Sequence, residues 1–430
     1  MHFDTLNAWL DWQESLHPQS IDLGLDRATE VFNRLNAYKK PITITVAGTN
    51  GKGSSIAFLE AIYRAQGLRV GAYTSPHILK YNERIKIDGT PVSDEQICAA
   101  FERIEAVRDN VSLSYFEFAT LAALDIFSRA NLDIQLLEVG LGGRLDAVNI
   151  IDPDVAIVTS ICIDHTSWLG NTRDAIAIEK AGIFRKGIPA IIGDINPPPS
   201  LLECAHKVNA QLQRIGHEFS YNNNPQDSNN WSWKNKSGRF AELPPPKLKG
   251  THQYRNASAV IAAIQSLQNK IPVSEQAIQQ GLKTVNLSGR FQLIQSNPAV
   301  LLDVSHNHQA ALTLVEYLQT EYKDTAVHAV FTMMGDKDLP GVIKLMQPCI
   351  KHWYISPLNN PRTSSETDLK KAFALCNNTQ VSFGFTDFLS AFNQAQNEAI
   401  KDNGLILVFG SFFLVSEYLS CLSPQQGEPL

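Results

Sequence analysis

An apolar run, a glycine-rich turn and the start of a helix follow one another in the sequence ITITVAGTNGKGSS, residues 42–55. Residues 42–46 have the composition of a short buried strand, and residues 54–66 have a helical pattern. The glycines allow backbone N–H groups to face an anion, and the helix N-terminus favours negative charge. Lys52 could reach a phosphate, and Ser54 could lie near Mg²⁺. The pattern predicts a phosphate-binding loop.

The loop departs from the common GxxxxGK[ST] pattern. Only two residues separate Gly48 from Gly51, and Gly53 follows the lysine. The alternative interpretation is a plain glycine-rich turn between a strand and a helix. The position of Lys52 directly before the helical stretch favours the phosphate loop over this alternative.

Short apolar runs alternate with helical patterns along most of the chain, which is typical of parallel sheets covered on both faces. The runs are residues 69–73, 134–139, 155–160 and 188–193, then 300–304, 327–332, 353–356, 381–385 and 405–409. We predict a two-domain α/β fold, in which a P-loop-type, mostly parallel sheet domain (1–286) precedes a smaller Rossmann-like domain (287–430). Residues 221–250 are rich in Asn, Ser, Trp, Lys and Pro, which indicates a surface excursion such as a hairpin.

Composition excludes several classes of protein. The 430 residues are 44% hydrophobic and 19% charged, which is too apolar for a disordered chain. The apolar runs are too short for a membrane span, and the acidic N-terminal segment does not resemble a signal peptide. A net charge of −6 argues against a broad nucleic-acid surface. The six cysteines form no metal-ligand spacing, so we expect reduced thiols in a cytoplasmic protein.

Polar residues follow several predicted strands. Glu138 ends the run 134–139, Ser75 follows the run 69–73, and Asp164 and His165 are expected to end a strand that begins at Val155. Each residue alone is more often a satisfied strand-end polar group than a ligand. Because all of them flank one phosphate loop, we interpret them together as a site for a hard cation.

The GTNGKGS loop resembles the ATP loop of the Mur ligase superfamily, and the glycine after its lysine resembles the folylpolyglutamate synthase branch, to which dihydrofolate synthase belongs. Further motifs in order along the chain support this resemblance: TSPH (74–77) with Tyr81, Glu83 and Arg84, LEVGLGGRLDA (137–147), IDHT (163–166), EKAGIF (179–184), GRF (289–291) and DVSHN (303–307).

The resemblance implies an ATP and magnesium site. Its nucleotide-binding residues would be Thr49, Asn50, Gly51, Lys52, Gly53, Ser54, Asn256, Arg290 and Asp303. Its Mg²⁺ ligands would be Ser75, Glu138 and His165, with two ions expected. Lys52, His306 and Lys180 would be catalytic. The family's usual pattern here is DxAHNP. This chain departs from it, with Ser305 in place of Ala and His308 in place of Pro.

Lys180 has a special role in that resemblance, because the matching lysine is carbamylated and helps to hold the second Mg²⁺. The plain alternative is a surface charge beside Glu179 on a helix. Carbamylation needs local burial, which Ile176, Ile178 and Ile183 make possible. For Asn256, polar pairing at an interface is an equally good interpretation.

Two stretches resemble acceptor-binding segments of the bifunctional bacterial enzymes, and a third adjoins them. The resemblance assigns substrate contacts to Asp22, Leu23, Gly24 and Leu25, to Phe116, Glu117, Phe118 and Ala119, and to Leu145, Asp146 and Ala147. Aromatic rings in the second stretch could stack on a flat heterocycle. Without the resemblance, the first stretch is a turn before a helix that starts with Asp26.

The resemblance implies ATP-dependent addition of L-glutamate to dihydropteroate and to the γ-carboxylate of reduced folates, through an acyl phosphate. Three alternatives stay open: folylpolyglutamate synthase activity alone, a cell-wall peptide ligase of the same superfamily, and a nucleotide-binding regulatory ATPase without a ligation product. We expect a monomer, with no nucleic-acid or membrane partner.

Overall fold

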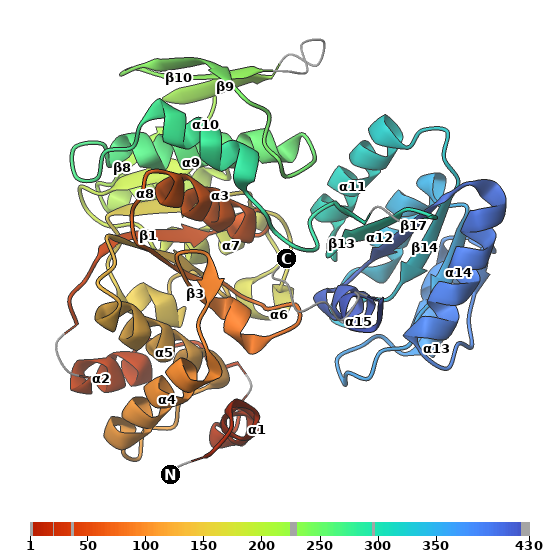
Figure 1. Ribbon diagram of the computed structural model, residues 1–430, viewed down its shortest axis with the longest axis horizontal. Coiled ribbons are helices and arrows are strands. Elements are labelled where there is room, and N and C mark those ends of the chain that lie inside the picture. Colours follow the sequence, from red (N-terminus) through yellow and green to blue (C-terminus); the bar gives the residue numbers. More distant parts are fainter. Residues whose placement is uncertain (1–2, 20, 36–37, 224–229, 295–296, 423–430) are drawn as a thin grey trace. The chain divides into compact units, whose positions relative to one another are not determined.

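The structure, a computed structural model, describes residues 3–19, 21–35, 38–223, 230–294 and 297–422 (Figure 1). The chain divides into two compact units. The first comprises Met1–Lys247 and Gln253–Asn286, and the second comprises Leu248–His252 and Leu287–Leu430. Each unit is a layered α/β structure with its own sheet, which confirms the predicted fold class.

The first unit is built on an eight-stranded sheet with the order β4-β3-β2-β5-β1-β6-β7-β8. From β2 to β8 all neighbours are parallel, whereas β3 pairs antiparallel with β2 and with β4, so the sheet is mixed. The strands are β1 (Ile42–Ala47), β2 (Val70–Tyr73), β3 (Ile85–Ile87), β4 (Thr90–Pro91), β5 (Ile134–Glu138), β6 (Val155–Val158), β7 (Pro189–Ile192) and β8 (Gln211–Arg214).

Helices lie on both faces of this sheet (Figure 1), as near-continuous burial of the parallel strands requires. The longer ones are α1 (Leu6–Leu16), α2 (Asp26–Arg34), α3 (Lys52–Ala65), α4 (Asp94–Arg108), α5 (Tyr115–Arg129), α7 (Arg173–Ala181), α8 (Pro199–Lys207), α9 (His252–Ser266) and α10 (Glu275–Thr284). Short helical turns are α6 (Thr166–Leu169), η1 (Tyr81–Arg84) and η2 (Ala147–Ile150).

The predicted surface excursion forms a small antiparallel sheet, which is more than a single hairpin. Its strands are β9 (Phe219–Asn223), β10 (Trp231–Asn235) and β11 (Arg239–Leu243), and residues 224–229 lie outside the described residues. Two tryptophans anchor it, because Trp233 donates its indole N–H to the carbonyl of Ser258 on α9 at 3.1 Å and Trp231 donates to the carbonyl of Pro244 at 2.8 Å.

The second unit has a six-stranded sheet with the order β12-β13-β17-β14-β15-β16, parallel except for β12. The strands are β12 (Gln292–Ile294), β13 (Val300–Asp303), β14 (Val327–Phe331), β15 (His352–Ile355), β16 (Val381–Ser382) and β17 (Leu405–Phe409). The helices are α11 (His308–Glu321), α12 (Leu339–Met346), η3 (Gln347–Cys349), α13 (Glu366–Leu375), α14 (Phe388–Asp402) and α15 (Phe412–Leu422).

One predicted strand is shorter than expected. β6 ends at Val158, so Asp164 and His165 lie in the following loop rather than at the end of a strand. Beyond β6 the amide of Ile161 donates to the Asp194 carboxylate at 2.8 Å instead of to a neighbouring strand, and the hydroxyl of Thr159 donates to the carbonyl of Asn50 at 2.7 Å.

Every helix in the described part of the chain is too short or too polar to span a bilayer. All six cysteines are free thiols, and Cys421 is exposed.

Candidate active site

The predicted phosphate loop connects β1 to α3, and two of its glycines are sterically required. A Cβ atom at Gly48 would lie 1.8 Å from Oγ1 of Thr159, and one at Gly51 would lie 2.7 Å from Oδ1 of Asn256. Gly51 also has a φ of 92°, which a side chain would strain. The loop therefore packs tightly against the strand end of β6 and against α9.

Two lysines converge on the same carbonyl oxygen of this loop. Lys180 donates to the carbonyl of Gly48 at 3.0 Å, and Lys52 donates to it at 3.1 Å. Lys180 is buried, with 4% of its surface exposed, which excludes the surface-charge interpretation. Burial and the nearby Lys52 lower the pKa of Lys180 to about 7. Ile176 and Ile183 are buried, whereas Ile178 is 46% exposed and contributes little to that burial.

Hydroxyl groups fix the rest of the loop. Thr49 donates its amide to the carbonyl of Ser160 at 2.7 Å, and its hydroxyl donates to the carbonyl of Cys162 at 3.2 Å. Thr159 and Ser160 both donate to the carbonyl of Asn50. These hydrogen bonds tie Thr49 and Asn50 of the loop to the segment that follows β6.

A chain of side-chain hydrogen bonds runs from α9 to the start of α3. Asn256 donates to Oε1 of Gln253 at 3.1 Å, and Gln253 donates its amide N–H to the hydroxyl oxygen of Ser54 at 3.4 Å. All three side chains are buried. The contact with Asn256 fixes which end of the Gln253 amide faces Ser54.

Glu138 lies directly beside the phosphate loop. It ends β5 and pairs in register with Val46, two residues before Gly48. Its carboxylate is 4% exposed and accepts a hydrogen bond from the amide of Ser75 at 3.3 Å. Two predicted metal ligands are therefore neighbours.

The glycine-rich turn after Glu138 is shaped by Asp146. Its carboxylate accepts hydrogen bonds from the amides of Leu141 at 2.8 Å and Val148 at 3.0 Å. Burial raises the pKa of Asp146 to about 7, although these amides and Lys52 oppose the shift.

His165 occupies a left-handed conformation, with a φ of 52°, directly before α6. Its backbone amide donates a hydrogen bond to Oδ1 of the Asp164 carboxylate at 2.8 Å. Asp164 is buried, and its negative charge acts to raise the pKa of Lys180 against the larger effect of burial.

The donor set suits a hard cation. Glu138 supplies a buried carboxylate oxygen, and Ser54 supplies a buried hydroxyl oxygen, both beside the loop. Within the described residues no three His, Cys, Asp or Glu side chains gather into a closed metal cage. Mg²⁺ keeps several waters and binds through few carboxylates together with phosphates, so one carboxylate and one hydroxyl oxygen beside this loop fit that ion.

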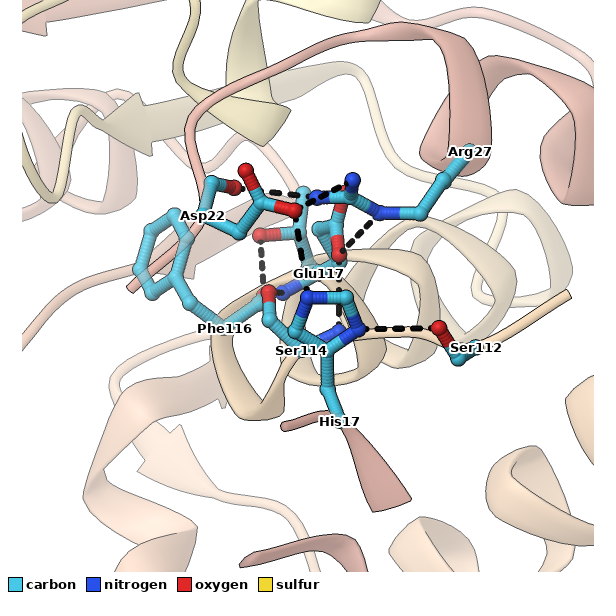
Figure 2. A network of polar contacts seen from close by, with 8 residues as sticks. His17, Asp22, Arg27, Ser112, Ser114, Phe116 and Glu117 are labelled. Carbon is cyan, nitrogen blue, oxygen red and sulfur yellow. Dashed lines mark hydrogen bonds and ion pairs between the residues drawn. The ribbon is translucent and has the colours of Figure 1, made fainter. Parts of the chain in front are cut away.

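The predicted acceptor stretches meet at the N-terminal end of α5. Figure 2 shows Asp22 and Glu117 on either side of Arg27, with Phe116 beside them. The Phe116 ring lies on the backbone after β5, since a Cβ atom at Gly140 would be 2.5 Å from its Cζ atom. The turn after Glu138 and the start of α5 are therefore in contact.

The remaining predicted acceptor residues differ in exposure. Phe118 and Ala119 are fully buried in the core, where Phe118 packs against Phe101 with ring centroids 5.2 Å apart. Ala147 is buried at the start of η2. The partly exposed members are Leu23, Gly24, Leu25, Phe116 and Leu145.

In the second unit, Asp303 ends β13 and is 3% exposed. It accepts hydrogen bonds from the amides of Phe291 at 3.1 Å and Ser305 at 2.8 Å, and from the hydroxyl of Ser305. Burial raises the pKa of Asp303, while Ser305 and Arg290 oppose the shift. The Arg290 guanidinium lies 5.0 Å from the ring centroid of Phe412.

His306 and its neighbours begin the next helix. His306 contacts the carbonyl of Val304 through Nδ1 at 2.8 Å, and Asn307 caps α11 by accepting from the amide of Ala310 at 3.0 Å. The atypical His308 is the exposed first residue of α11, a position that proline also suits.

Sequence reasoning missed Arg27 and Gln253. The sequence does signal the partner of Arg27. SYFE, residues 114–117, has the spacing of a capping box, which places Glu117 at the start of a helix. Nothing in the sequence shows that Arg27 reaches it.

Comparisons with known proteins agree with this geometry. Residues 289–412 match the family model "Mur ligase, glutamate ligase domain". The chain is 40% identical over 423 residues to dihydrofolate synthase/folylpolyglutamate synthase of Escherichia coli K12, covering 98% of this chain and 96% of that protein.

Solved structures are similar over nearly the whole length. E. coli FolC in complex with DHPP and ADP has a TM-score of 0.90 and 39% identity, covering 97% of each chain. The bifunctional folylpolyglutamate synthase/dihydrofolate synthase of Yersinia pestis, complexed with AMPPNP and a Mn ion, has a TM-score of 0.89 and 41% identity, covering 97% of this chain and 98% of that one.

Proposed function

Because the chain belongs to the dihydrofolate synthase/folylpolyglutamate synthase family of ATP-dependent ligases, we propose that it joins L-glutamate to dihydropteroate and to the γ-carboxylate of reduced folates. The observation that carries this proposal is the arrangement of Lys52, Lys180 and Glu138 around one phosphate-type loop beside the Phe116 stretch.

The loop binds the triphosphate of ATP. Residues 49–54 offer backbone N–H groups at the start of α3, where the field of the helix favours an anion. Lys52 exchanges its contact with the Gly48 carbonyl for phosphate oxygens. We assign the further nucleotide contacts to Asn256 in the first unit and to Arg290 and Asp303 in the second.

Ser75, Glu138 and His165 would hold Mg²⁺, and a carbamylated Lys180 would help to hold a second ion. When bound, Mg²⁺ neutralises charge on the phosphates. The Ser75 amide, which donates to the Glu138 carboxylate, helps to hold that carboxylate in place.

The reaction has two steps. A carboxylate oxygen of the acceptor attacks the γ-phosphorus of ATP, and ADP leaves, which gives an acyl phosphate. The amine of L-glutamate then attacks the acyl carbon, loses a proton and expels phosphate. Positioning and charge neutralisation supply most of the rate enhancement. His306 stabilises the transferred phosphoryl group.

The acceptor lies against residues 22–25, Phe116 and the 145–147 turn. Phe116 is half-buried, which leaves ring surface for a flat heterocycle. Phe118 and Ala119, in the core, hold the helix that carries Phe116.

Incubation with ATP, Mg²⁺ and L-glutamate tests the proposal, with dihydropteroate, tetrahydrofolate or a UDP-muramoyl acceptor in parallel. We expect phosphate release and a glutamylated product with the first two acceptors. Product from tetrahydrofolate alone would leave folylpolyglutamate synthase activity, and product from the muramoyl acceptor would indicate a cell-wall ligase. Phosphate release that needs neither acceptor nor glutamate would indicate a regulatory ATPase.

We also propose a monomer that works in the cytoplasm. The six free thiols support a reducing compartment. Sedimentation of the purified protein gives the oligomeric state.

A further inference from the structure

One guanidinium group bridges two carboxylates from distant parts of the chain (Figure 2). Arg27, in the first turn of α2, donates through Nη1 to the Asp22 carboxylate at 2.6 Å and through Nη2 to the Asp22 carbonyl at 3.0 Å. Its Nε donates to Oε2 of Glu117 at 3.3 Å, and its Nη2 lies 3.1 Å from Oε1. Arg27 therefore connects the segment before α2 to α5.

Glu117 has a second partner that makes this connection rigid. Its Oε2 accepts the amide N–H of Ser114 at 2.7 Å, which caps the first turn of α5. The Glu117 side chain is 3% exposed. A carboxylate this deeply buried requires a nearby cation or several hydrogen-bond donors. Arg27 supplies the cation, and the Ser114 amide supplies a further donor.

His17 holds Asp22 from the other side. Its Nε2 lies 3.1 Å from Oδ2 of Asp22, and its Nδ1 lies 2.9 Å from the hydroxyl of Ser112 (Figure 2). Ser112 is two residues before Ser114, the N-cap of α5. His17 and Arg27 therefore both form hydrogen bonds at the N-terminal end of this helix. We call His17, Asp22, Arg27, Ser112 and Glu117 the α5 latch.

We propose that the latch sets the geometry of the acceptor site, with Arg27 as a positioning residue for the known reaction. This inference rests on the proposed function, in which residues 22–25 and Phe116 contact the acceptor. Those two stretches belong to different parts of the chain, and Arg27 bonds to the first and to Glu117, the direct neighbour of Phe116. The Asp22 carboxylate is engaged within the latch and so acts through it.

Two variants test the proposal. Arg27→Met removes both bridges. Glu117→Gln keeps the side-chain length and a capping-box residue, so the α5 cap stays while the ion pair is lost. For both we expect the KM for dihydropteroate to rise roughly tenfold or more, because small misplacements of a substrate are costly. The kcat at saturation and the KM for ATP should stay within about twofold of wild type, since among the described residues the partners of the latch lie outside the phosphate loop.

Arg103→Met is the matched control. Arg103 on α4 also donates to a buried carboxylate of α5, Asp125, at 2.9 Å, but further along the helix from its capped end. An equal rise of the dihydropteroate KM in this control would show that any loosening of α5 has the same effect, and would overturn the proposal.

The double variant R27M/E117Q tests whether Arg27 and Glu117 act together as one latch or as two independent contacts. If the two residues act as one unit, the KM of the double variant should equal that of the more impaired single variant. Multiplication of the two single effects would contradict the latch.

Hydrogen exchange tests whether the latch holds the two segments in place, and it does so independently of the proposed function. Amides of residues 22–27 and 114–117 should exchange faster in Arg27→Met than in wild type, and at the wild-type rate in Arg103→Met. Unchanged exchange in Arg27→Met would overturn the latch even if ligation occurs. A wild-type protein that fails to ligate glutamate to dihydropteroate would instead overturn the acceptor role, whatever the exchange rates.

Discussion

Lys180 donates a hydrogen bond to the carbonyl oxygen of Gly48, 3.0 Å away, in the strand-to-helix turn where Lys52 binds the same oxygen. A buried amine beside a second cation loses its proton easily, and the pKa of Lys180 is lowered to about 7. Carbamate formation needs the neutral amine, so this placement prepares Lys180 for reaction with carbon dioxide.

The first prediction follows from that pKa. The Lys180 amine is neutral above pH 7 and protonated below it, so carbamate should be present at pH 8 and should decline as the pH falls through about 7. Carbon-13 NMR of protein equilibrated with ¹³C-bicarbonate should show a carbamate resonance that Lys180→Met lacks. The exposed Lys207 provides a control, because Lys207→Met should keep the resonance. A resonance that survives in Lys180→Met would contradict the assignment.

Lys52→Ala should abolish most turnover while the fold stays intact. The side chain contacts loop carbonyls at 3.1 and 3.3 Å, so its removal leaves the backbone ladder of β1 untouched. Loss of a charge that stabilises the transferred phosphoryl group typically costs about 10²–10³-fold in kcat. Phosphate release measures turnover and circular dichroism measures whether the fold is intact, with Lys207→Ala as the control. Wild-type turnover in Lys52→Ala would count against the phosphate-loop assignment.

Gln253→Leu should weaken the binding of the divalent metal ion. Gln253 donates to the Ser54 hydroxyl oxygen and accepts from Asn256, so its loss frees Ser54 to rotate and leaves the Asn256 amide without that acceptor. We expect the Mg²⁺ concentration for half-maximal activity to rise several-fold, because Ser54 is proposed to lie near Mg²⁺ and loss of support around a metal site usually weakens metal binding. Binding of Mn²⁺ with AMPPNP, followed by electron paramagnetic resonance, gives a readout without turnover.

The matched control for that substitution is Gln265→Leu on the same helix. The amide nitrogen of Gln265 makes no hydrogen bond within the described residues, so its loss should leave metal binding unchanged. Equal Mn²⁺ affinity in wild type and Gln253→Leu would refute the role of Gln253.

The strand, turn and helix around Lys52, the central strands and the strand-end position of Glu138 could be predicted from sequence, because each depends on residues close together in the chain. The β6 prediction failed at its end, since Thr159 and Ile161 form hydrogen bonds with Asn50 and Asp194, and no local pattern shows such partners. The small antiparallel sheet was predicted only as a possible hairpin, because its strands are anchored by tryptophan contacts to α9.

The acceptor site shows the same division. The aromatic character of Phe116 and Phe118 was visible, but which ring faces the core depends on the rotation of α5, which α1 and α4 determine through packing. The Arg27 contact with Glu117 joins residues far apart in sequence and lies beyond any periodicity argument.

Ser305→Ala restores the usual residue of the family and tests how Asp303 is kept ionised. Both the amide and the hydroxyl of Ser305 donate to Asp303, and these bonds oppose the rise in the Asp303 pKa that burial causes. Loss of the hydroxyl should raise that pKa further. We propose that Asp303 contacts nucleotide hydroxyls as a carboxylate, so the acid limb of the kcat/KM profile for ATP should move to higher pH in Ser305→Ala. The control is Ser364→Ala in the same unit, where the hydroxyl is buried and makes no hydrogen bond within the described residues. Superimposable acid limbs for wild type and Ser305→Ala would show that Asp303 does not govern ATP binding.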